Sequence, residues 1–173
     1  MAEILMQEES GTPSTPSSGK WKLYPKAAGW YYLDDAGVEI PLVLAPTTFT
    51  PAIANLTVGT GGTLAGRYTQ VGKLVNFDVR AILGSSGFSV AGSLTLTFPV
   101  TIATYTNVTP IGLVRMRDAS PGITYSGVIS TNGTIAIMQS DATYLTVAVL
   151  SSAIPFTWAA SDEIEISGTY IAA

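Results

Sequence analysis

The feature that most constrains the fold is an alternation of residue types between Gly66 and Leu83, in the stretch GRYTQVGKLVNFDVRAIL. In its second half, every other residue is apolar and suited to a core: Val75, Phe77, Val79 and Ala81. This period of two is that of a β-strand with one buried face. The glycine of Val71-Gly72 suits a tight turn, because glycine adopts positive φ without strain. The stretch therefore predicts a hairpin of strands 67–70 and 73–83.

Charged residues are scarce in this chain. They make up 12% of its 173 residues, against about 25% in an average globular domain. So few charges cover a monomer's surface poorly, which favours a homo-oligomer whose copies bury part of that surface. Scattered exposed apolar residues on a monomer are the alternative, since they are also normal. The length allows one domain with an appendage or two small domains.

Several classes of function are disfavoured by composition. A net charge of −4 with eight basic residues, and no basic run longer than Arg115-Met116-Arg117, argues against nucleic-acid binding. The chain has no cysteine and no histidine, which removes Ser-His-Asp and Cys-His sites and most zinc sites. The glycines at 59–62 lie between strands without a following helix, so they predict a turn and not a phosphate loop. We therefore expect no enzyme and no catalytic, cofactor or metal residues.

The first residues, MAEILMQEES, carry no secretory signal, because they lack a basic start and a long apolar core. No run approaches the ~18 apolar residues of a membrane span. We expect a soluble protein made in the cytoplasm, without membrane insertion.

Residues 1–19 predict an extended arm and linker, since 11–19 read GTPSTPSSG. Such an arm is either a frayed terminus or an anchor that orders on a partner. Ile4, Leu5 and Met6 favour the anchor, because a purely solvated tail does not need them.

Residues 20–45 predict a small aromatic β-meander with strands 21–24, 30–33 and 38–42 and turns rich in Asp and Gly. Aromatic residues at this density indicate a small core or an interface; a sugar-binding platform is the alternative. A meander of ~25 residues is not stable alone, so it must dock on something. Its candidate attachment residues are Trp21, Tyr24, Trp30 and Tyr32.

After a second linker at 45–51, residues 50–173 predict one all-β domain. The predicted strands are 53–58, 64–70, 73–83, 93–98, 111–116, 124–130, 134–139, 144–150 and 163–171. Asn132-Gly133 is the strongest hairpin signal and predicts a type I′ turn, in which both residues have positive φ. Many short strands without a helical period favour an antiparallel β-sandwich, specifically a jelly roll.

Two groups of carboxylates are the remaining candidates for chemistry. Asp34-Asp35 lies in a predicted turn, where Asp is common for local reasons. Glu163 and Glu165, beside Asp162, share a strand face. They fit a glycosidase pair or a calcium edge, but the polar face of an edge strand is the favoured interpretation.

Arg115 and Arg117 also share one strand face. They either pair with acids across an interface or form a solvated face, and the solvated face is favoured. Three Asn-x-Thr triplets, at Asn55, Asn107 and Asn132, are expected by chance in a threonine-rich chain without a signal peptide.

Two stretches resemble proteins of tailed bacteriophages. GKWKLYPKAAGWYYLDDAGVEIPL is similar to a short segment near the start of many phage fibre and appendage proteins, with matches at Leu23, Tyr24, Lys26, Tyr32, Asp34, Asp35, Gly37 and Glu39. The stretch 66–83 resembles the terminal β domain of phage fibres and virion surface proteins. That resemblance is carried by Phe49-Thr50-Pro51, Gly66-Arg67-Tyr68, residues 71–75, Leu94, Leu96, Pro99 and residues 166–170.

The resemblance implies a virion structural protein, trimeric, with a jelly-roll-like outer domain and an N-terminal attachment segment. It brings no catalytic residues. The chain has no long shaft, which favours a capsid decoration protein or short head fibre bound to the major capsid protein or another virion protein. The alternative is a short tail fibre or receptor-binding tip whose loops 84–90 and 118–123 contact a host glycan or protein.

Overall fold

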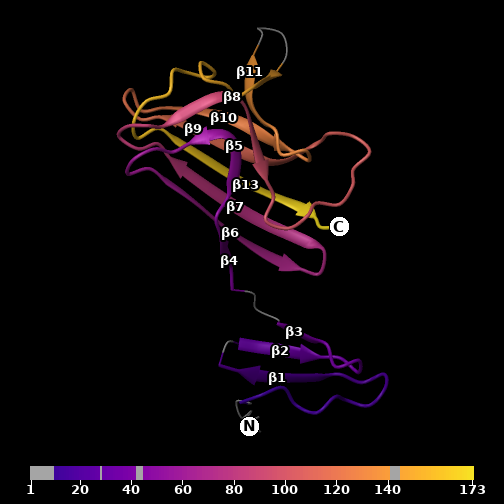
Figure 1. Cartoon of the computed structure of the whole chain (residues 1–173). Coiled ribbons are helices and arrows are strands. Elements are labelled where there is room, and N and C mark those ends of the chain that lie inside the picture. The colour runs from indigo at the N-terminus through magenta and orange to yellow at the C-terminus, as the bar shows by residue number, and fades with distance from the viewer. Residues whose placement is uncertain (1–9, 28, 42–44, 141–144) are drawn as a thin grey trace, which may run out of the picture. The chain divides into compact units, whose positions relative to one another are not determined.

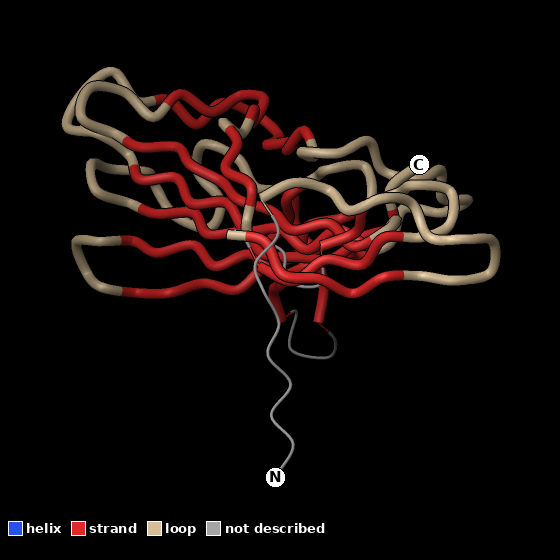
Figure 2. The backbone as a smooth tube through the Cα atoms, turned by 90° about the horizontal axis from the view of Figure 1, so that it is seen from below, coloured by secondary structure: helices blue, strands red, loops and turns tan. Residues whose placement is uncertain are grey.

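A computed structural model describes residues 10–27, 29–41, 45–140 and 145–173 (Figure 1). The chain divides into two compact units, Met1–Ala45 and Pro46–Ala173. All regular structure in the described residues is strand (Figure 2). Ile4, Leu5 and Met6 of the predicted arm lie outside these residues, as do Leu42 and Tyr144 at the ends of two predicted strands.

The small unit is the predicted three-stranded meander. Its strands β1 (Lys22–Lys26), β2 (Gly29–Leu33) and β3 (Glu39–Pro41) pair antiparallel in the order β1-β2-β3. The β2–β3 turn is held by Asp34, whose Oδ1 accepts hydrogen bonds from the amides of Ala36 (3.0 Å) and Val38 (2.7 Å). Asp34 therefore has the local role in a turn that its position predicted.

The described residues of the large unit form ten strands in two antiparallel sheets. These strands are β4 (Thr47–Phe49), β5 (Ala52–Thr57), β6 (Thr63–Val71), β7 (Leu74–Ile82), β8 (Ser89–Thr97), β9 (Pro110–Asp118), β10 (Ile123–Ser130), β11 (Ile135–Ser140), β12 (Leu145–Val149) and β13 (Glu163–Ile171). Eight of them form one sheet in the order β12-β11-β10-β9-β13-β7-β6-β4, and β5 pairs with β8. The end strands β12 and β4 do not pair with each other, so the sheet is not closed into a barrel.

The two sheets share one core. Side chains of β5 and β8, among them Ile53, Leu94 and Leu96, cluster with the inward residues of the eight-stranded sheet. The all-β, antiparallel prediction is thus confirmed, and the two layers are consistent with a β-sandwich. Every predicted strand of this unit is present. The structure adds β4, within the stretch 45–51 that was predicted to be a linker. The three residues of β4 are too few to show a strand period.

The β6–β7 hairpin confirms the leading prediction from the sequence. Val71 pairs with Leu74 across a two-residue turn, in which Gly72 has φ +57°. The predicted apolar face of β7 is buried in the core, since Val75 and Phe77 are at most 1% exposed.

The turn at Asn132-Gly133 differs from the predicted type I′. Gly133 has φ +79°, but Asn132 is not in the positive-φ region, and the Gly133 amide donates to the Ser130 carbonyl at 2.8 Å. This is a longer hairpin loop with glycine in the left-handed position. Gly133 lies against β8, and its carbonyl accepts the Leu96 amide at 2.9 Å. The turn that packs against β8 is therefore of a different type from the predicted one.

Candidate functional site

The attachment residues predicted in the small unit are divided between the two faces of its sheet. Register places Leu23 beside Tyr32 and Pro25 beside Trp30, so these four side chains share one face. Trp21 belongs to the same face, with its ring 5.8 Å from that of Tyr32. Trp21 is 61% exposed and Trp30 39%. We call this surface, with Leu23 and Ile40, the aromatic face.

Tyr24 lies on the opposite face and is buried at 5% exposure. Its hydroxyl donates to Glu39 at 2.6 Å. Lys26 pairs with the same carboxylate at 2.7 Å, and Thr12 also donates to it at 2.6 Å. Hydrogen bonds from Lys26 first, then Thr12 and Tyr24, lower the pKa of Glu39 to about 2. Tyr24 is therefore part of a polar cluster that holds the small unit together.

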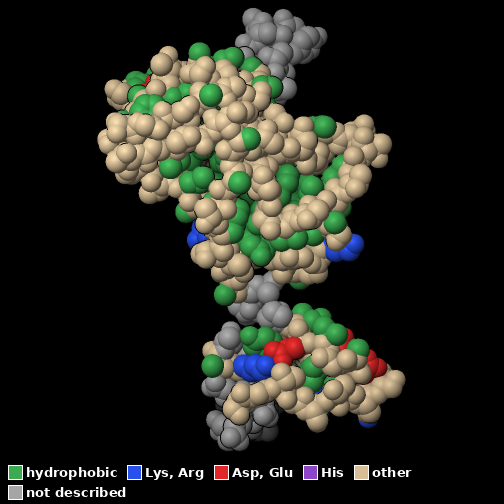
Figure 3. Space-filling view, viewed as in Figure 1, with side chains coloured by type: hydrophobic (Ala, Val, Ile, Leu, Met, Phe, Trp, Pro, Cys, Tyr) green, Lys and Arg blue, Asp and Glu red, His purple; other side chains and the backbone are tan. Residues whose placement is uncertain are grey.

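Residues 10–19 cover this polar face. Besides Thr12, Ser14 contributes its carbonyl oxygen, which accepts from Lys22 at 2.6 Å, and Pro16 is buried. The charged side chains of β1–β3, Lys22, Lys26 and Glu39, point to this covered side, so these described strands place no charged side chain on the aromatic face. In the space-filling view, the visible side of the large unit has few charged side chains (Figure 3).

The second candidate is a groove of about 680 Å³ on the solvent side of the eight-stranded sheet. It lies across β6, β7, β13, β9, β10 and β11. Its polar and exposed apolar lining comes from alternate residues whose neighbours enter the core: Arg67, Asp78, Arg80, Leu113, Arg115, Thr124, Ser126, Met138, Glu165 and Ser167. We call it the arginine groove.

Strand register aligns the charges of the groove in rows. Arg80, Glu165 and Arg115 are directly opposite one another on β7, β13 and β9. Glu163 is opposite Arg117 in the next row along. Opposite charges facing each other across antiparallel strands stabilise a sheet.

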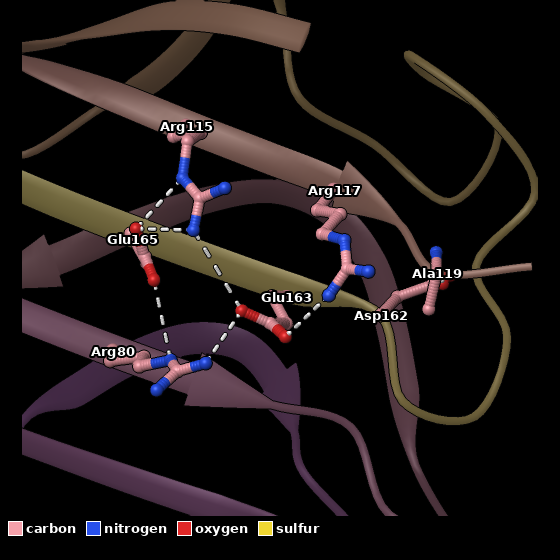
Figure 4. Close-up of polar contacts among 7 residues, drawn as sticks. All are labelled: Arg80, Arg115, Arg117, Ala119, Asp162, Glu163 and Glu165. Carbon is pink, nitrogen blue, oxygen red and sulfur yellow. Dashed lines mark hydrogen bonds and ion pairs between the residues drawn. The ribbon is translucent and has the colours of Figure 1, made fainter. Parts of the chain in front are cut away.

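The close-up shows how these rows connect (Figure 4). Glu165 accepts a hydrogen bond from Arg115 Nε at 2.8 Å, Arg115 Nη2 lies 2.7 Å from the same oxygen, and the other oxygen of Glu165 lies 3.3 Å from Arg80 Nε. Glu163 accepts from Arg80 Nη2 at 2.8 Å and from Arg117 Nη1 at 3.2 Å. A separate pair joins Arg67 Nε to Asp78 at 2.7 Å.

The carboxylates form the lower layer of this network. The side chain of Glu163 is 10% exposed, whereas those of Arg80, Arg115 and Arg117 are 53%, 46% and 43% exposed. Arg80 first, with further help from Arg117, holds the pKa of Glu163 below its ordinary value despite partial burial. The guanidinium groups are therefore the part of this network most exposed to solvent.

Asp162 does not join its two neighbours. It is fully buried, and its carboxylate accepts from the amides of Ala119 (2.9 Å) and Ala159 (2.6 Å). Two loops are thereby tied together at one end of the sheet. Within the described ranges, no three acidic side chains gather as metal ligands. Glu163 and Glu165 hold arginines, and Asp162 holds backbone amides.

One sequence interpretation of these residues is wrong. β13 is a central strand between β7 and β9, so Glu163 and Glu165 are not on an edge. Arg115 and Arg117 are on a solvent-exposed face, as predicted, and there they pair with Glu165 and Glu163 of the same chain. The chain has four arginines, and all lie on this sheet face. The alternation of residues along each strand shows which face of that strand its arginines are on. Only the order of the strands in the sheet shows that all four arginines share one face.

No protein-family model matches the chain, and neither the curated proteins nor the solved structures give a significant match. In the described part of the chain, no helix has the length and apolar character to cross a membrane. The class that the fold defines is an all-β protein with antiparallel sheets.

Proposed function

We propose that this chain is a structural protein of a bacteriophage virion, made in the host cytoplasm and acting as a capsid decoration protein or short head fibre. The observation that carries the proposal is the exposed aromatic face of the small unit. Its opposite face is covered by residues 10–19, and Lys22, Lys26 and Glu39 are turned to that side. The resemblance of this segment to phage appendage proteins is the reason for proposing a virion protein.

The aromatic face has the chemistry of a protein-docking surface. Its two outer strands include Pro25 and Pro41, which cannot donate backbone hydrogen bonds, so addition of a foreign strand at either edge is disfavoured. The remaining way for a partner to bind this sheet is contact with the aromatic face. Trp21 and Trp30 expose roughly half of the ~150–250 Å² that an aromatic side chain buries, and covering them is worth about 5 kcal/mol at ~25 cal/mol per Å². The partner in this proposal is the major capsid protein or another virion protein.

A homotrimer would multiply this modest attachment through effective concentration. Val71, Leu74 and Ile171 support self-association of the large unit. They are 62%, 49% and 42% exposed, and register makes them adjacent at one end of the sheet. We propose that three large units, each a jelly-roll-like sandwich, form an outward knob. The second candidate, a receptor-binding tip, is favoured by the arginine groove.

The test replaces Trp21 and Trp30 by Ser and measures occupancy on purified particles. We expect occupancy to fall at least tenfold while the large unit keeps its unfolding transition. Ile123→Ser, which removes a 48% exposed apolar side chain from the large unit, is the matched control. Deleting residues 1–19 should also abolish attachment. This deletion also removes the hydrogen bonds of Thr12 and Ser14 to the polar face of the small unit, so it does not test the aromatic face alone.

Full occupancy of the double variant would refute attachment through the aromatic face. Electron microscopy of labelled particles distinguishes head from tail. A monomer in sedimentation at micromolar concentration would refute the trimer.

A further inference from the structure

We propose that the arginine groove binds a saccharide bearing a carboxylate. The proposal concerns the large unit alone and does not depend on a place in a virion. It also moves ligand contact from the loops 84–90 and 118–123, where the sequence predicted it, to the strands.

The groove holds unused hydrogen-bond donors in fixed positions. A guanidinium has five N–H groups, and the ion pairs to Glu163 and Glu165 use only some of them. Within the described residues, Nη1 of Arg80, Nη1 of Arg115 and both Nη atoms of Arg67 donate no hydrogen bond. The carboxylates beneath orient these groups, so less side-chain entropy is lost when a ligand binds.

The charge of the groove favours an anion. Of the lining residues, Arg67, Arg80 and Arg115 contribute three positive charges, and Asp78 and Glu165 contribute two negative ones, which leaves +1. The chain as a whole carries −4. Because the guanidinium groups form the outer layer, an approaching carboxylate meets them first. Arginine and carboxylate also match in planar geometry.

The remaining lining favours a sugar over a bare ion. Thr124, Ser126 and Ser167 offer hydroxyl groups that both donate and accept hydrogen bonds. Leu113, which is 64% exposed, offers an apolar surface for the C–H face of a ring. The volume of about 680 Å³ lies within the ~300–1,000 Å³ of small-molecule sites and is small for a protein partner.

The experiment is a titration of the full-length ¹⁵N-labelled chain, followed by NMR of the four arginine Nε–H signals. The probes are glucuronate, galacturonate, N-acetylneuraminate and a galacturonate oligomer, with glucose and galactose as neutral controls. Glucose 6-phosphate and inorganic sulfate test whether any anion suffices. We expect saturable shifts of Arg80 and Arg115 with at least one carboxylated sugar, weakened by salt, and none with neutral sugars.

Variants separate binding from general charge. Arg115→Gln should weaken binding at least tenfold, and Ser126→Glu should abolish it by placing an anion opposite Arg115. Lys73→Gln removes the large unit's other cation, in the β6–β7 turn outside the groove, and should change affinity less than twofold. Circular dichroism and thermal unfolding confirm that each variant is folded.

Four results would overturn the proposal. These are no saturable shift with any carboxylated sugar, equal shifts with neutral sugars, equal binding of sulfate and the carboxylated sugars, and equal loss in Lys73→Gln and Arg115→Gln. A change of oligomeric state in Arg115→Gln without loss of sugar shifts would instead identify the groove as a contact between copies, and would also overturn it.

Discussion

Replacing Asp162 by Ala should destabilise the large unit more than any exposed charge substitution. The carboxylate is fully buried and accepts from the amides of Ala119 and Ala159, which belong to two separate loops. The substitution removes both acceptors at once and leaves a small cavity. It therefore tests whether this residue has a structural role, in contrast to the paired glutamates that follow it.

The cost follows from the two lost hydrogen bonds. Bonds to a charged acceptor contribute about 1.5–3 kcal/mol each. Ala159 is an exposed residue, so water can reach its amide, and the lower end of the range applies. We expect a loss of about 3 kcal/mol in the free energy of unfolding. For a unit spanning Pro46–Ala173, this corresponds to a fall of about 10 °C in melting temperature.

Urea unfolding, followed by the fluorescence of Trp158, measures this loss. Trp158 is 7% exposed and lies one residue before Ala159, so it reports on the affected loop. Replacing Trp21 and Trp30 by Phe in all samples makes it the sole tryptophan. Far-UV circular dichroism provides a second probe of the same transition.

Two further variants serve as controls for the Asp162 prediction. Asp162→Asn keeps one acceptor oxygen and should lose about 2 kcal/mol. Asp118→Ala removes a half-buried carboxylate that makes no side-chain hydrogen bond within the described residues, and should stay within about 0.5 kcal/mol. A loss below about 1 kcal/mol for Asp162→Ala, or equal losses for Asp162→Ala and Asp118→Ala, would refute the reasoning.

Three other predictions concern the large unit. Because Arg80 lowers the pKa of Glu163, the ionised carboxylate stabilises the folded state. This contribution is complete above the ordinary glutamate pKa and is lost as the pH falls below it. Glu163→Gln should therefore flatten the acid side of a melting-temperature profile between pH 7 and 3, and an unchanged acid slope would contradict this. Gly84→Ala would place a Cβ 2.2 Å from the Thr60 carbonyl oxygen and should cost about 2–3 kcal/mol in urea unfolding; a loss no larger than that of Ser85→Ala would count against it. Tyr170→Phe removes a hydroxyl that donates to the Val100 carbonyl (2.8 Å) and accepts from its amide (3.1 Å). We expect a loss of about 2 kcal/mol in the free energy of unfolding. A fall of less than about 2 °C in melting temperature would contradict this prediction.

Strand positions could be predicted because their signal is local. The alternation around Phe77 requires only that one face be buried, whatever buries it, and Gly72 supplies the positive φ of the adjacent turn. Twelve strands were located in this way, although their ends shift by a few residues. β4 was missed, because three residues carry no period and its pairing partner Arg67 lies about twenty residues away.

The candidate site could not be predicted, because it depends on strand order. Glu163 and Arg80 are separated by 83 residues in sequence, and they meet only because β13 inserts between β7 and β9. The same alternating strands are compatible with many orders, and an edge position for β13 satisfies its pattern equally well. The sequence does show that Arg115, Arg117 and the two glutamates share strand faces.

The small unit shows the same division. Its aromatic density and turns were evident from residues 20–45, and they predicted a docking surface without saying which face it used. Tyr24 and Trp30 look equivalent in the sequence, yet one is buried against Glu39 and the other is exposed. The period of two assigns residues to one face or the other, but which face is covered was decided by the path of residues 10–19. Local periodicity thus specifies the strands of this protein, whereas contacts between distant segments decide which strand faces remain available for binding.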